Sequence, residues 1–258
     1  MTESTILQQT KSLLNSSKYV NEESWQVSTW THRAWLAGGC TAVLISLAKS
    51  ILLTARGATT GPRAWLQPIS AAFIGYILAD LATGIYHWAI DNYGSAQTPV
   101  FGSQIEAFQG HHQQPWAITK RQFANNLYIS AAAVTAIVSP INMFSGDPVL
   151  LGFSGVFLGC IMFSQQFHAW AHTPKGKLPP LVAALQDAGI IVPRGQHAAH
   201  HRPPYNSSYC IVSGVWNKVL DKSKFFVAME VALFHVFGAP ARSWSDPNSD
   251  WTQVSGMY

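Results

Sequence analysis

The sequence predicts an all-α integral membrane protein with four transmembrane helices and a histidine-rich cap on one side. Three observations predict this fold: the composition, four long apolar stretches, and the grouping of the histidines. Apolar residues make up 48% of the 258 residues and charged residues only 11%, whereas an average soluble protein has roughly 25% charged residues. Because so few charges cannot cover a water-facing surface, part of the chain is expected to lie in a membrane.

The four apolar stretches are residues 34–55, 67–90, 123–138 and 149–170. A helix of about 20 residues crosses the ~30 Å hydrocarbon core of a bilayer. Lys49 interrupts the first stretch, but a lysine near a helix end can extend its amine to the interface. The third stretch is shorter and is expected to end before Pro140, and the Gly- and Pro-containing links 56–63 and 142–148 are expected to be turns.

The remaining segments flank these spans. We expect a polar N-terminal segment over 1–33, a four-span region over 34–172 that includes a polar loop at 94–122, and a C-terminal cap over 173–258. Apolar but short stretches at 178–192 and 225–237 predict interfacial or capping helices. The first 30 residues contain no secretory signal and little arginine, so either a targeting segment has been removed or none is needed.

Charge and cysteine usage exclude other classes. The net charge is +4, but Lys and Arg are spread through loops beside apolar stretches, which argues against a nucleic-acid surface. The three cysteines form no C-x-x-C motif, so no disulfide framework is expected. In a four-span topology 13 of the 16 Lys and Arg residues fall on the side of the histidines. The positive-inside bias therefore places that side in the cytoplasm or the plastid stroma.

Eight of the ten histidines form four groups, and in this topology every group falls on the same side of the membrane. The groups are His87 with the nearby Asp91, the pair His111 and His112, the pair His168 and His172, and the H-x-x-H-H cluster His197, His200 and His201. Histidines four residues apart on a helix present two imidazoles to one metal. Eight histidines plus an aspartate exceed the ligands of one ion, so two ions are predicted. Imidazole suits zinc, copper, iron and nickel alike, which leaves the metal open.

Four stretches resemble one family of membrane enzymes. They are ADLATGIYHWAIDNYG (79–94), IEAFQGHHQQPWAIT (105–119), FSQQFHAWAH (163–172) and QHAAHHRPPYNSSYCIVSG (196–214). They resemble the membrane desaturases that include plasmanylethanolamine desaturase, the bacterial CarF proteins and the plant plastid palmitoyl-lipid desaturases called fatty acid desaturase four. The resemblance is closest to the plastid branch.

The resemblance implies a di-iron desaturase that uses O2 as co-substrate. It implies that the iron ligands, and hence the catalytic residues, are His87, His111, His112, His168, His172, His197, His200 and His201. Asp91 stands where broader desaturase families have a histidine, so it is expected either to bind metal or to accept a hydrogen bond from a ligand. Asp80, Glu106 and Asn126 are candidates for supporting the ligands. Asp80 lies inside the second span, where a buried acid needs a partner.

The plastid branch implies a specific reaction, a trans double bond at carbon 3 of palmitate at sn-2 of phosphatidylglycerol. It further implies a chloroplast membrane, expected to be the thylakoid, and a ferredoxin-like electron donor. Lys120, Arg121, Arg194 and Arg202 are candidate contacts for the anionic head group, although the same charges could simply set the topology. The alternatives are vinyl-ether formation, lipid hydroxylation on the same scaffold, and a non-enzymatic metal carrier.

Overall fold

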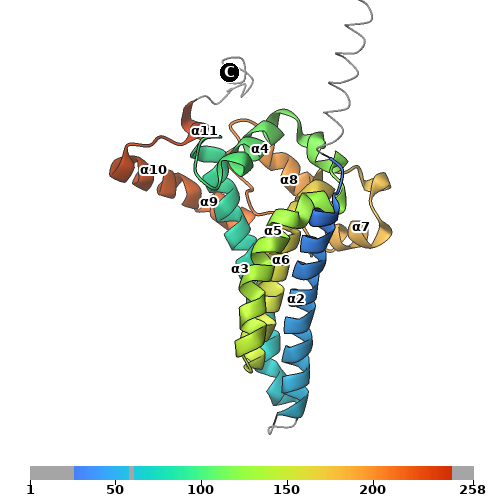
Figure 1. The fold of residues 1–258 in the computed structure, drawn as a ribbon. Helices are drawn as coiled ribbons and strands as arrows, with labels where there is room; N and C mark the ends of the chain where they lie inside the picture. The colour runs from blue at the N-terminus through green and yellow to red at the C-terminus, as the bar shows by residue number, and fades with distance from the viewer. Residues whose placement is uncertain (1–25, 58–60, 246–258) are drawn as a thin grey trace, which may run out of the picture.

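The computed structural model describes residues 26–57 and 61–245, and within these ranges the chain is helical, without strands. Four long helices form a bundle that carries a cap of shorter helices at one end (Figure 1). The long helices are α2 (Trp30–Arg56), α3 (Pro62–Asn92), α5 (Phe123–Phe144) and α6 (Pro148–His172). All four are long and apolar enough to cross a membrane. The predicted fold class is therefore confirmed. Three spans extend beyond both predicted ends, and α5 starts at the predicted residue but ends later.

Close packing and buried hydrogen bonds hold the four long helices together. Helix α3 packs mainly on α6, and α2 packs on α5 and α6. A Cβ atom at Gly75 would lie 2.9 Å from the Phe153 carbonyl oxygen, so only glycine permits this approach of α3 to α6. Ser46 Oγ donates to the Leu151 carbonyl at 2.9 Å. Small residues and interhelical hydrogen bonds of this kind are the usual means of helix association in membranes.

The third span runs through Pro140 rather than ending before it. Proline removes one helical hydrogen bond, and membrane helices tolerate this where neighbouring groups satisfy the freed backbone atoms. Beyond the proline, at the end of α5, Lys49 Nζ donates to the carbonyl oxygens of Asn142 at 2.5 Å and Ser145 at 3.0 Å. The lysine that interrupts the first span thus caps the C-terminal end of α5, a favourable place for a cation.

The predicted polar loop 94–122 was wrong in part, because it contains helix α4 (Gly102–Gln113) and the 3-10 helix η1 (Pro115–Lys120). Ile105 and Phe108 lie three residues apart on α4 and pack on Ile90 of α3. This short apolar stripe explains why a largely polar segment folds as a helix. His111 and His112 therefore project from the last turn of a helix rather than from a loop.

The cap contains η2 (Lys175–Lys177), α7 (Pro180–Asp187), α8 (Arg194–His200), α9 (Asn217–Lys222), α10 (Phe225–Phe237) and α11 (Arg242–Ser245). Helices α7 and α10 occupy the two stretches predicted as capping helices, and α10 projects sideways from the bundle (Figure 1). In the H-x-x-H-H cluster, His197 and His200 lie on α8. Of the predicted polar segment 1–33, residues 1–25 lie outside the described residues. The three-part division of the chain stays a prediction.

Candidate metal centre

All nine residues predicted to surround the metals meet at the capped end of the bundle, in two groups. The five-histidine group is His111, His168, His172, His197 and His201, and the Asp91 group is His87, Asp91, His112 and His200. Within each group one donor atom from every residue lies within 4.8 Å of the others. The four segments that carry the histidines thus converge from α3, α4, α6 and the region of α8.

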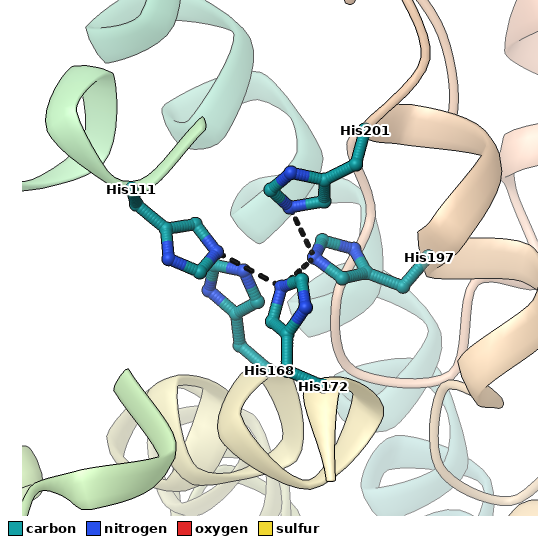
Figure 2. Close-up of side chains that lie close together, drawn as sticks. All are labelled: His111, His168, His172, His197 and His201. Carbon is teal, nitrogen blue, oxygen red and sulfur yellow. Dashed lines mark hydrogen bonds between the residues drawn. The ribbon is translucent and has the colours of Figure 1, made fainter. Parts of the chain in front are cut away.

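In the five-histidine group the rings point toward one another from three directions (Figure 2). His172 Nε2 lies 2.9 Å from His111 Nε2 and 2.9 Å from His197 Nε2. His201 Nε2 lies 3.2 Å from His197 Nε2. His168 joins them from one turn earlier on α6, as the four-residue spacing predicted. The five histidines therefore bring five ring nitrogens close together, one from each residue.

In the Asp91 group one carboxylate oxygen lies at the centre. Asp91 Oδ2 is 3.2 Å from His87 Nε2, 3.2 Å from His112 Nε2 and 3.3 Å from His200 Nε2. Asp91 is only 4% exposed, and an ionised carboxylate at such depth needs compensating charge. A cation bound among the three imidazole nitrogens would supply that charge.

Backbone carbonyls orient two histidines of the Asp91 group. His87 Nδ1 lies 2.9 Å from the Tyr209 carbonyl oxygen, and His200 Nδ1 lies 2.8 Å from that of Ser207. Because a carbonyl only accepts, each Nδ1 must carry the proton and donate it. The lone pair of each ring is then on Nε2, which faces Asp91. Metal-binding histidines commonly use their second nitrogen in this way.

The residues present fit a divalent transition metal. Among the described residues, several buried donor atoms of the two groups have no hydrogen-bond partner: His87 Nε2, Asp91 Oδ1, both ring nitrogens of His168, His197 Nδ1 and His200 Nε2. Buried polar atoms nearly always have partners, and a metal ion is one explanation for exceptions. Imidazole with carboxylate suits iron, among other metals.

The protonation state of the cap histidines agrees with metal binding. Burial, followed by the charges of neighbouring histidines, lowers the pKa of His111, His197 and His201. Burial also lowers the pKa of His200, although the negative charge of the nearby Asp91 raises it in part. These rings are therefore neutral at pH 7, and a neutral imidazole offers the lone pair that a metal needs.

The three predicted supporting residues lie in different surroundings. Asn126 Nδ2 donates to the Gln165 carbonyl at 3.1 Å and to Gln166 Oε1 at 3.2 Å, and so ties α5 to α6 just before His168. Asp80 is fully buried but contacts backbone amides instead of the nine donor residues. Glu106 is exposed on α4, and in the described part of the chain it makes no contact with either group.

Of the four cations predicted to meet a head group, Lys120 and Arg121 lie just before α5, and Arg194 and Arg202 lie in the cap. Arg194 Nη1 donates to the His172 carbonyl at 3.2 Å. It also borders a cavity of about 100 Å³ that opens beside the five-histidine group and is lined by Pro115, Ala171, His172, Arg194, Ala198 and His201. Lys120 and Arg202 are exposed, and Arg121 is half-buried.

Sequence reasoning missed several residues that hold the centre. The carbonyl oxygens of Ser207 and Tyr209 act through the backbone, which leaves no signal in the side chains. Arg242 of α11 donates to the carbonyl oxygens of Asp91, at 3.2 Å, and of Gly94. Its place near the end of the described residues gave no reason to connect it with α3.

Comparison with known proteins identifies the class. The lipid desaturase domain matches residues 76–244 of the chain, a range that contains all nine donor residues. The chain therefore belongs to the lipid desaturase family, and it is an enzyme of the desaturase class. No solved structure matches it significantly.

Within this family the chain is similar to chloroplast enzymes. It is 58% identical over 225 residues to fatty acid desaturase 4, chloroplastic, of Arabidopsis thaliana, which covers 87% of this chain and 68% of the relative. It is 55% identical over 243 residues to fatty acid desaturase 4-like 1, chloroplastic, of the same plant, covering 94% and 81%. The plasmanylethanolamine desaturase of Myxococcus xanthus is 37% identical over 172 residues, covering 64% and 60%. The predicted resemblance is confirmed.

Proposed function

We propose that this protein is a di-iron, O2-dependent acyl-lipid desaturase that introduces a trans double bond at carbon 3 of palmitate at sn-2 of phosphatidylglycerol. The observation that carries the proposal is the convergence of nine donor residues into two adjacent groups. The identity of 58% to a chloroplast fatty acid desaturase supports the substrate class. We place the enzyme in a chloroplast membrane, the thylakoid, with the donor residues toward the stroma and a ferredoxin-like protein as electron donor.

In this proposal each group holds one iron ion. Bound iron would supply the O2 activation that removes hydrogen from an unactivated methylene, which no side-chain acid or base can do. The histidines contribute neutral lone pairs, and Asp91 contributes negative charge that offsets the charge of the ion. The Ser207 and Tyr209 carbonyls keep the Nε2 atoms of His200 and His87 turned toward Asp91.

The position of the donor residues along the helices supports a double bond near the carboxyl end of the acyl chain. His87 and Asp91 lie in the last two turns of α3, and His172 is the last residue of α6. If α3 and α6 cross the bilayer, these residues lie near its surface, where the ester groups of phospholipids also lie. Arg194, beside the five-histidine group, is suitably placed to attract an anionic head group.

The test is expression of the full chain in a host that contains phosphatidylglycerol and a plant-type ferredoxin, followed by lipid-resolved acyl analysis. A trans-3-hexadecenoyl chain confined to phosphatidylglycerol is expected, and the His200→Ala variant should lack it. The matched control is His235→Ala, because His235 is an exposed histidine on α10, away from both groups. A vinyl ether or a hydroxylated lipid in place of the trans-3 product would contradict the proposed reaction.

The number of ions needs a separate measurement on purified protein. Two iron ions per chain are expected from two donor groups, and the His235→Ala control should retain both. One ion per chain in active material, or an active preparation loaded with another metal, would contradict the di-iron assignment while leaving the desaturase class intact.

A further inference from the structure

A buried segment that follows α8 connects Asp80 to the metal centre. Residues 207–216, which we call the strap, carry the Ser207 and Tyr209 carbonyls that orient His200 and His87. Residues 208–214 of the strap are all buried. Because the strap forms no helix or strand, its backbone amides need partners from elsewhere.

Asp80 supplies those partners. Its Oδ1 accepts hydrogen bonds from the backbone amides of Val212 at 3.1 Å, Ser213 at 2.8 Å and Gly214 at 2.8 Å. Its Oδ2 accepts from the Trp216 amide at 3.3 Å. Asp80 is 0% exposed, so the free energy of hydration that its carboxylate lost on folding is recovered through these amides. A carboxylate suits the task because it only accepts and has room for several donors.

The hydrogen bonds between Asp80 and the strap lie at a distance from the donor residues. Asp80 and His87 are on the same helix and about two turns, or roughly 10 Å, apart. No atom of Asp80 belongs to either donor group. The connection runs through the strap: Asp80 holds residues 212–216, and the same run of backbone presents the Tyr209 carbonyl to His87.

Other contacts of the strap lead toward the same centre. Gln196, next to His197, donates from Nε2 to the Gly214 carbonyl at 2.8 Å. The Val192 amide donates to the Val212 carbonyl at 2.8 Å, just before α8 begins. The strap therefore contacts α3, through Asp80 and His87, and also α8 and the residues just before it.

We propose that Asp80 is a positioning residue of the metal centre. By clamping the strap, it keeps the Ser207 and Tyr209 carbonyls on Nδ1 of His200 and His87 and so fixes which ring nitrogen of each faces Asp91. The metal itself rests on the function proposed above. The orientation of the two rings does not, because it is a property of the metal-free chain.

The first test measures that orientation directly. In metal-free protein labelled with 15N-histidine, NMR distinguishes rings protonated on Nδ1 from rings protonated on Nε2. The native chain should show His87 and His200 with the proton on Nδ1. In Asp80→Asn, one carboxylate oxygen is replaced by a donor that faces the Trp216 amide, so both rings should become mixtures of tautomers while His235 stays unchanged. Unaltered tautomers in a folded Asp80→Asn protein would overturn the proposal.

The matched control is Glu230→Gln, which changes a second buried carboxylate. Glu230 is 2% exposed and accepts hydrogen bonds from Trp88 Nε1 at 3.0 Å and Trp244 Nε1 at 2.6 Å, but it has no contact with the strap. Replacing this carboxylate by an amide should lower the melting temperature without altering the His87 and His200 tautomers. If Glu230→Gln shifts the tautomers as strongly as Asp80→Asn, the effect is general loosening and the proposal fails.

A milder variant serves if Asp80→Asn does not fold. Thr83 Oγ1 accepts from the Ile211 amide in the middle of the strap at 3.5 Å, and Thr83→Val removes this contact with little change in shape. It should shift the same two tautomers to a smaller degree. After iron loading, Asp80→Asn and Thr83→Val should also change the Mössbauer spectrum of the bound iron, in that order of size. Absence of any change in Thr83→Val, in tautomers and in spectrum, would count against the strap as the connection.

Discussion

The two donor groups lie side by side but are held in different ways. The five-histidine group contains only neutral imidazoles, and its members His172 and His201 are half-buried beside an open cavity. The Asp91 group contains a carboxylate, and its His87 and His200 are completely buried and oriented by backbone carbonyls. The difference indicates one accessible, neutral site and one enclosed, charge-compensated site.

The largest effect is expected from removing a central histidine of either group. His168→Ala and His200→Ala should each lower desaturase activity by more than about 100-fold, since even residues behind metal ligands commonly cost 10–100-fold. Product analysis in the expression host, with protein level measured by immunoblot, tests this. Substantial activity in His168→Ala would remove the five-histidine group from the reaction.

A smaller but more selective effect is expected from Asp91→Asn. The change preserves shape and removes the charge, so affinity for iron in the Asp91 group should fall by about 10–100-fold. The five-histidine group should keep its ion, and iron analysis should approach one ion per chain. Loss of both ions together would show that the two groups are not separable.

Metal removal should reveal the difference in access without any substitution. A chelator is expected to take iron in two phases, quickly from the five-histidine group and slowly from the Asp91 group. Absorption of the iron–chelator complex over time measures both phases. A single phase that accounts for all iron would contradict the contrast in burial.

Filling the cavity should slow only the fast phase. Ala198 lines the cavity beside His201 and is itself exposed, so Ala198→Leu adds bulk at the opening without entering the core. The fast phase should slow several-fold, and Ala198→Gly should not slow it. An equal effect on the slow phase would mean that both groups open to the same side.

The smallest effect is expected from Glu106→Gln. Glu106 is exposed and belongs to neither donor group, and exposed substitutions usually change stability by about 0.5 kcal/mol or less. Activity and iron content should match the native protein. A clear loss of iron would restore Glu106 as a supporting residue.

The sequence was sufficient to predict the spans and the residues that gather at the centre. Stretches of apolar residues have a direct physical meaning in a bilayer, and clustered histidines on one side of four crossings have few other uses. The helices that carry His111 and His200 were not predicted, because α4 and α8 are short and largely polar and are stabilised by packing against α3 and α6.

The sequence also could not predict how neighbouring histidines divide between the two groups. His111 and His112 go to different groups, as do His200 and His201. Consecutive side chains on a helix point about 100° apart, so the division follows once the helices are known. The role of the Ser207 and Tyr209 carbonyls could not be predicted at all, since every residue has a carbonyl and only the path of the chain decides which one reaches a ring.

Helix α10 is fastened at both ends, and this fixes its position relative to the metal centre. Near its start Phe226 packs on Trp88 of α3, and beyond its end Arg242 donates to the Asp91 carbonyl. Its exposed apolar residues, including Val236 and Phe237, are thus presented at a constant level relative to Asp91. If the four long helices cross a bilayer, this exposed apolar surface would lie against lipid. In the proposed reaction α10 would keep a constant distance between the lipid that it contacts and the donor residues.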